Sequence, residues 1–191
     1  MEGVLTPEVW INVAQRTGIE GLLRTTRDEP DYDVLMQYRL DLLDKHGITI
    51  TQIQEVIAEL PLLDGCIEFL DALRSEVQLI ILSDTFEQFA TPFLKQMKWP
   101  TVFCHQLIIE NDCITGYKLR QPDQKRQAVK ALHGLNYNVI AAGDSFNDTT
   151  MLSEADHGFL FHAPQNVIDQ FPQYPALNTY DELLAAIRSG Y

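Results

Sequence analysis

Basic residues, glycine, proline and cysteine are all scarce in this chain. Ten glycines and nine prolines among 191 residues, with 46% hydrophobic residues, exclude a disordered or fibrous protein. Only 14 lysines and arginines oppose 27 aspartates and glutamates, and the net charge of −13 argues against nucleic acid or an anionic membrane as partner. The three cysteines are widely spaced and odd in number, which favours a reduced, cytoplasmic protein over a disulfide framework.

Long hydrophobic runs are absent as well. Residues 77–82 form the longest apolar run near an expected strand, and they are interrupted by Gln78 and far too few to span a bilayer. Residues 1–7 contain neither a basic segment nor an apolar core, so no secretory signal is expected. The length suits one domain with a modest insertion, and a homodimer is the default expectation because symmetric dimers are the commonest oligomers.

The first 75 residues show helical patterns only. The expected helices are separated by capping and breaking residues: Thr6-Pro7 and Gly18 around the first, Asp31 and Gly47 around the second, Thr49 or Thr51 and Pro61 around the third, and Gly65 before the fourth. Because no strand pattern interrupts residues 11–64, we expect them to form a small helical cap.

The pattern changes after residue 75. Expected strands at 77–83, 139–142 and 158–162, and a hairpin of 102–110 with 113–119, alternate with expected helices at 86–97, 123–133, 147–154 and 180–188. This alternation predicts an α/β fold with a doubly wound, mostly parallel sheet. Residues 1–10 and 65–191 are expected to form this core.

Polar residues follow two of the expected strands, where ligands bind in such sheets. Ser83-Asp84-Thr85 follows the first, and a hydroxyl beside free helix N–H groups can hold a phosphate. Taken alone, the same tripeptide also serves as an ordinary helix N-cap.

A pair of carboxylates follows another strand. Asp144 ends it and Asp148 lies four residues on, where one helical turn returns it to the same edge of the sheet. Hard oxygen ligands suit Mg²⁺ holding a phosphate, although a polar turn with a helix cap has the same residues. Lys125, at the start of another helix, either neutralises phosphoryl charge or is a solvated lysine.

In this order, Ser83-Asp84-Thr85, Lys125 and Gly143-Asp144 through Asp148 resemble the motifs of the haloacid dehalogenase superfamily of phosphotransferases. Nearly the whole chain is similar to the phosphoserine phosphatase branch, and most similar to its members that also transfer phosphate from phosphoserine to homoserine. Four segments carry the closer likeness: Gly3–Glu8, Leu82–Thr85, Lys125–Gln127 and Ala142–Ser145.

The resemblance implies a reaction through an aspartyl-phosphate with Mg²⁺ as cofactor. Glu2 matches the catalytic acid and base, with its carbonyl facing the metal. Ser83, Asp84, Lys125 and Asn147 match substrate-side positions, and Asp144 and Asp148 match the metal-binding acids. In the cap, Glu8 and Arg39 match the positions that bind the amino and carboxylate groups of phosphoserine, because a guanidinium binds a carboxylate through two hydrogen bonds. Without the resemblance, both would be solvated helix residues.

One position departs from the family pattern. The nucleophilic Asp should stand directly before Met1, at the end of a central strand of roughly five or six residues. Without that strand, those ending at Ser83 and Asp144 would have no neighbour between them. Since the other motif residues are retained, we expect the chain start to be displaced from that of an active enzyme.

The sequence therefore predicts a Mg²⁺-dependent phosphomonoester hydrolase acting on phosphoserine, with homoserine as a further phosphoryl acceptor. Two alternatives remain open: a catalytically silent phospho-amino-acid or Mg²⁺ binder, and a phosphatase for another small phosphate.

Overall fold

The first part of the chain is helical in the computed structural model, which describes residues 1–25, 28–29 and 31–190. Its elements are α1 (Val9–Thr17), the 3-10 helix η1 (Glu20–Leu23), α2 (Tyr32–His46), α3 (Ile50–Glu59) and α4 (Cys66–Glu76). Asp31 and Thr49 cap α2 and α3 through their side chains, as predicted. Gly18 and Gly47 end α1 and α2, as predicted, and both are in the left-handed conformation.

The start of α1 was predicted wrongly. Its N-cap is Glu8, not Thr6. The preceding residues form a tight loop in which the amides of residues 4–6 donate to the carbonyl oxygen of Met1 at 2.8–3.3 Å. This loop draws Thr6 into the interior, where it is fully buried and cannot cap a helix.

Strands and helices alternate in the rest of the chain, which confirms the α/β class. The elements are β1 (Ile80–Phe86), α5 (Glu87–Gln96), β2 (Thr101–Glu110), β3 (Cys113–Lys118), α6 (Gln124–Gly134), β4 (Ile140–Gly143), η2 (Phe146–Asp148), α7 (Thr149–Glu154), β5 (His157–Phe161), α8 (Gln165–Gln170), β6 (Ala176–Leu177) and α9 (Tyr180–Ser189). The sequence did not predict α8 and β6, because six and two residues are too few to show a period. The first strand begins three residues later than predicted and continues through Ser83-Asp84-Thr85.

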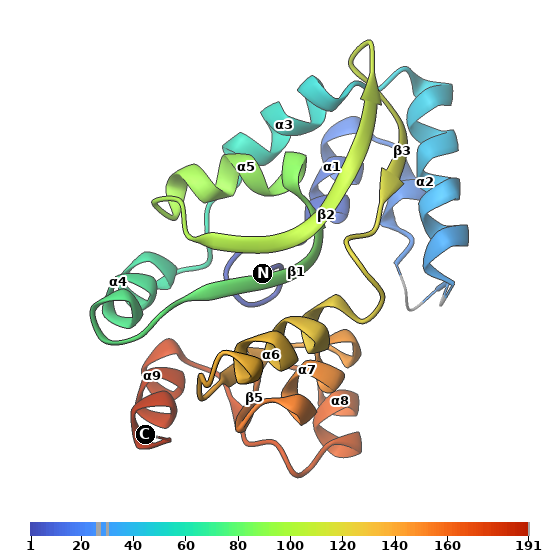
Figure 1. Cartoon of the computed structure of the whole chain (residues 1–191). Coiled ribbons are helices and arrows are strands. Elements are labelled where there is room, and N and C mark those ends of the chain that lie inside the picture. The colour runs from blue at the N-terminus through green and yellow to red at the C-terminus, as the bar shows by residue number, and fades with distance from the viewer. Residues whose placement is uncertain (26–27, 30, 191) are drawn as a thin grey trace.

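The described strands form two sheets of three (Figure 1). One has the order β1-β2-β3, with β1 parallel to β2 and β3 antiparallel to β2. The other has the order β4-β5-β6 and is parallel throughout. In Figure 1 the first sheet lies with α1, α2, α3 and α5, while the second lies with α6, α7, α8 and α9. A core of buried side chains from both groups joins them, including Ile81 of β1, Phe161 of β5 and Leu183 of α9.

A cavity of about 470 Å³ separates the two sheets. It is lined by apolar side chains and by β1 and β4, including Ile81 and Ala141, with Met1 and Leu5 from the N-terminal loop. Within the described part of the chain, β1 pairs only with β2 and β4 only with β5. Each of these two strands therefore has one edge without a strand partner.

The β2–β3 hairpin reaches from the first sheet to the helices. Its tip residue Asp112 accepts hydrogen bonds from the amide and hydroxyl of Thr51 on α3, at 3.3 and 2.8 Å. Near its other end, the Tyr117 hydroxyl donates to Asp33 on α2. The hairpin thus connects α2 and α3 to the sheet that contains β1, the strand that carries Ser83.

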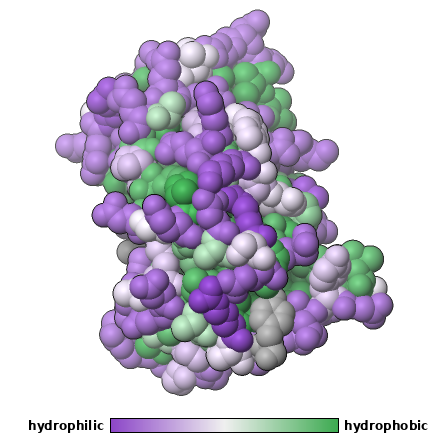
Figure 2. Space-filling model, turned by 90° about the vertical axis from the view of Figure 1, so that its left-hand side faces the viewer, coloured by the Kyte–Doolittle hydropathy of each residue, from purple (hydrophilic) through white to green (hydrophobic). Residues whose placement is uncertain are grey.

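Hydrophilic side chains cover most of the face shown in Figure 2, with apolar residues confined to smaller patches between them. None of the helices in the described ranges is long and apolar enough to cross a membrane.

Candidate active site

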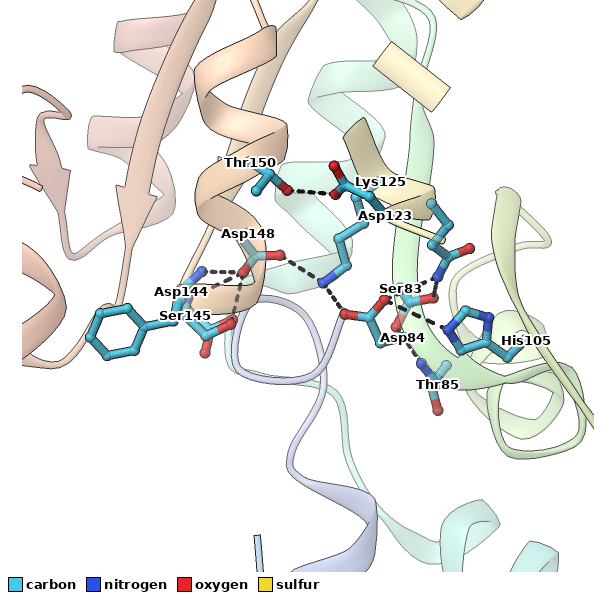
Figure 3. Close-up of polar contacts among 12 residues, drawn as sticks. Ser83, Asp84, Thr85, His105, Asp123, Lys125, Asp144, Ser145, Asp148 and Thr150 are labelled. Atoms are coloured by element: carbon cyan, nitrogen blue, oxygen red, sulfur yellow. Dashed lines mark hydrogen bonds and ion pairs between the residues drawn. The ribbon is translucent and has the colours of Figure 1, made fainter. Parts of the chain in front are cut away.

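Lys125 lies at the centre of the candidate site (Figure 3). Its ammonium is 2.7 Å from Asp84 at the end of β1 and 2.8 Å from Asp148, which follows β4. Burial works against a charge on Lys125, but the two carboxylates outweigh burial and raise its pKa. The structure therefore brings together the three motifs that the sequence placed at separate strand and helix ends.

Ser83 is buried beside this pair. Its hydroxyl oxygen accepts a hydrogen bond from the Thr85 amide at 3.3 Å, and its carbonyl accepts one from the Gln124 side chain. The same Gln124 amide donates to Asp84 at 3.1 Å. Gln124 thus fixes Ser83 and Asp84 of β1 next to Lys125, and no pattern in the sequence predicted this role.

Asp148 is oriented by the turn after β4. One of its carboxylate oxygens accepts hydrogen bonds from the amides of Asp144 and Ser145, at 3.0 and 3.2 Å, and from the Ser145 hydroxyl, while the other faces Lys125. Burial would raise the pKa of Asp148, but Lys125 outweighs it and the pKa is lowered. Gly143 permits this packing, because a Cβ there would lie 2.4 Å from the Asp148 Cβ.

Asp144, unlike Asp148, is not held by hydrogen bonds to its side chain within the described residues. Its side chain takes no hydrogen bond from any described residue, and burial together with Asp148 raises its pKa to about 6. No group of three histidine, cysteine or acidic side chains in the described ranges forms a metal site by itself. The donors nevertheless fit Mg²⁺, because Asp144 lies in a cluster short of positive charge and hard oxygen ligands suit that ion.

Glu2 is brought to the same place by the N-terminal loop. Its carboxylate accepts a hydrogen bond from the Val9 amide at 3.0 Å. Burial, with a contribution from Glu8, raises its pKa to about 7. The loop passes so close to Asp144 that a Cβ on Gly3, whose φ is +74°, would lie 2.4 Å from a carboxylate oxygen. Only glycine satisfies both conditions there.

Arg39 approaches from α2 and is buried. One terminal nitrogen donates to the Arg24 carbonyl at 2.8 Å, but Nε is buried without a hydrogen-bond partner among the described residues. Burial lowers the pKa of Arg39 to about 10, while Glu2 and Glu8 act in the opposite direction and favour its charge. Of the predicted site residues, Glu8 and Asn147 are exposed.

Two further residues at this site were missed from the sequence. The Trp10 ring lies under the Arg39 guanidinium, 4.6 Å from its central carbon. His105 is buried behind Asp84, with 3.8 Å between Nε2 and the carboxylate. Both residues are aromatic side chains within amphipathic segments, and such positions are usually core, so no local signal identified them.

Comparison with known proteins identifies the same family that the sequence motifs resemble. The family model for haloacid dehalogenase-like hydrolases matches residues 7–156. Phosphoserine phosphatase ThrH of Pseudomonas aeruginosa is 58% identical over 184 residues, covering 96% of this chain and 90% of that protein. A phosphoserine phosphatase of Pseudomonas syringae pv. tomato has the same identity over 184 residues, covering 96% of this chain and 78% of that protein. A substrate-bound phosphoserine phosphatase structure shares the fold, with a TM-score of 0.78, 15% identity and coverage of 96% and 92% of the two chains.

Proposed function

This chain belongs to the haloacid dehalogenase-like hydrolases, in the phosphoserine phosphatase branch, and from that premise we propose that it hydrolyses phosphoserine to serine with Mg²⁺ as cofactor. The observation that carries the choice of substrate is Arg39. It is a buried cation whose Nε has no hydrogen-bond partner in the described part of the chain, and Glu2 of the same site favours its charge. A substrate with a phosphate and a carboxylate would bind Lys125 through its phosphate and Arg39 through its carboxylate.

Ser83 and Lys125 are the proposed phosphate ligands. Lys125 supplies positive charge, and Asp84 and Asp148 hold its ammonium in place. Asn147 is assigned to the substrate side, and Glu8 to the substrate ammonium. The helices within residues 11–64 would act as the cap that brings Arg39 over the phosphate.

Asp144 and the main-chain carbonyl of Glu2 would hold Mg²⁺, with Asp148 completing the acidic set. Asp148 already uses both of its oxygens within the protein, so its contribution is to orient Asp144 and Lys125. Bound Mg²⁺ supplies charge neutralisation of the phosphoryl group.

Glu2 is the proposed general acid and base. A carboxyl with a pKa of about 7 is protonated often enough at neutral pH to give a proton to the leaving serine oxygen. In the mechanism that the resemblance implies, the nucleophile would be an Asp placed directly ahead of Met1, at the end of a strand between β1 and β4. Its carboxylate attacks phosphorus as the bond to serine breaks. Water, deprotonated by Glu2, then attacks phosphorus and displaces the Asp carboxylate, which releases inorganic phosphate; homoserine can take the place of water and leave as its phosphate ester.

The two open strand edges support this position for the nucleophile. β1 and β4 each have an unpaired edge at the same apolar cavity, and Met1 lines that cavity. Unpaired buried backbone groups are costly, so a strand inserted there would be stabilised by hydrogen bonds on both sides.

The test extends the chain ahead of Met1 by a short apolar strand that ends in Asp. Phosphate release from phosphoserine is measured for this form, for the same extension ending in Asn, and for the 191-residue chain. We expect activity in the Asp form alone. Inactivity of all three folded proteins would support a silent binder, and equal activity in the Asn form would refute the aspartyl-phosphate.

A further inference from the structure

A series of aromatic rings in edge-to-face contact supports the Arg39 guanidinium. The Trp10 ring on α1 lies 4.6 Å from the guanidinium carbon of Arg39 on α2. Trp10 in turn packs edge-to-face on Phe89 of α5, with 5.2 Å between ring centroids, and Phe89 packs edge-to-face on Phe86 at the end of β1. Phe86 and Phe89 are both fully buried. The guanidinium of a cap helix therefore rests on rings fixed by the strand that carries Ser83.

The aromatic contact uses none of the hydrogen-bond donors of the guanidinium. A ring attracts the cation through its π face, and the five N–H groups remain donors for other partners. One terminal nitrogen donates to the Arg24 carbonyl, the other lies 3.9 Å from the Met36 sulfur, and Nε has no partner among the residues that the structure describes. The ring thus holds the guanidinium carbon in place without taking any of its hydrogen bonds.

We propose that Trp10 is a positioning residue that sets substrate specificity by orienting Arg39 toward the substrate carboxylate. This inference rests on the proposed function, because it requires Arg39 to bind that carboxylate. Trp10 itself touches the guanidinium and not the reacting phosphate. Its loss should weaken the recognition of a carboxylate and leave the recognition of a phosphate unchanged.

The test compares two ligands that differ in the carboxylate. Binding of phosphoserine and of phosphoethanolamine is measured by calorimetry with Mg²⁺ present, for the wild-type chain and for Trp10→Leu, Trp10→Phe and Arg39→Leu. A cation on an aromatic face contributes enough for Trp10→Leu to weaken phosphoserine binding by about 3- to 30-fold, with phosphoethanolamine binding unchanged. Trp10→Phe keeps an aromatic face and should restore most of the loss.

Trp99 provides the matched control, since it is the other tryptophan and its side chain is 63% exposed. Trp99→Leu should change neither affinity. In a Trp99→Phe chain Trp10 is the sole tryptophan, so its fluorescence should respond to phosphoserine and not to phosphoethanolamine.

The outcomes separate the two proposals. If Arg39→Leu leaves the discrimination between the ligands intact, or if the wild-type chain binds neither, phosphoserine recognition by Arg39 is wrong. If Arg39→Leu abolishes discrimination while Trp10→Leu preserves it, or weakens both ligands equally, the positioning role of Trp10 is wrong and the proposed substrate stands.

Discussion

Replacing Lys125 with methionine removes the positive charge between two carboxylates and keeps most of the side-chain volume. Lys125 is 8% exposed and Asp148 is 6% exposed, so their ion pair is an interior one. Breaking a buried pair by removing one partner costs about 3–5 kcal/mol, against about 0.2–1 kcal/mol for a surface pair. The Asp84 side chain, 34% exposed, is better solvated, so Asp148 should account for most of the cost.

The cost should depend on pH with a defined sign. Lys125 holds the pKa of Asp148 below its ordinary value, so this pair stabilises the wild type above that value and loses its contribution as the pH falls. Without Lys125, burial raises the pKa of Asp148, and the variant gains stability as the pH falls through that raised value. The difference between the two proteins should therefore be largest at neutral pH and shrink in acid.

Thermal unfolding at pH 7.5 and pH 5, without metal, measures this difference. At neutral pH the variant should lose about 6–20 °C in Tm, using about 2–4 °C per kcal/mol for a chain of this size. Adding Asp148→Asn to the methionine variant removes the unpaired charge and should recover much of the loss. An equal loss at both pH values, or no recovery in the double variant, would refute the electrostatic explanation.

Three other results are expected. Glu2 and Asp144 have raised pKa values of about 7 and about 6, so the folded state binds protons more readily than the unfolded state and stability should rise from pH 8 to pH 5. Glu2→Gln should flatten that rise in urea titrations, and an unchanged slope would contradict the raised pKa. Gly3→Ala should destabilise more than Gly18→Ala, because both have positive φ but only Gly3 has Asp144 within 4 Å; equal losses would show that the close approach is unimportant. Asp112→Ala should speed amide hydrogen exchange at the start of α3, and unchanged exchange there would show that the hairpin tip does not hold this helix.

The residues that the sequence located best are those whose chemistry follows from local structure. Lys125 and Asp144 lie beside helix and strand ends, and Ser83 lies in β1 just beyond its regular pairing with β2, so the parallel strands bring all three to one edge. The helix caps at Asp31 and Thr49 were predicted for the same reason, because a side-chain oxygen directly before a helical pattern accepts hydrogen bonds from the free amides of the first turn.

The parts that were missed depend on contacts between distant segments. The Trp10–Arg39 contact joins two helices, and neither residue carries a local mark of the other. Thr6 has the features of a helix cap, but the N-terminal loop turns it inward because residues 4–6 bond to the Met1 carbonyl. The role that a residue takes in the fold is therefore decided by packing against distant segments, which its own local propensity does not specify.

The separation of the strands into two sheets has a mechanical consequence. Apolar packing is non-directional, so the core shared by the two sheets tolerates a small relative shift that a hydrogen-bonded ladder would forbid. Lys125 reaches Asp84 beside one sheet and Asp148 beside the other, so its two ion pairs connect the sheets through one flexible side chain. Shortening that side chain should therefore separate the two carboxylates from their shared cation and weaken the link between the halves of the phosphate site.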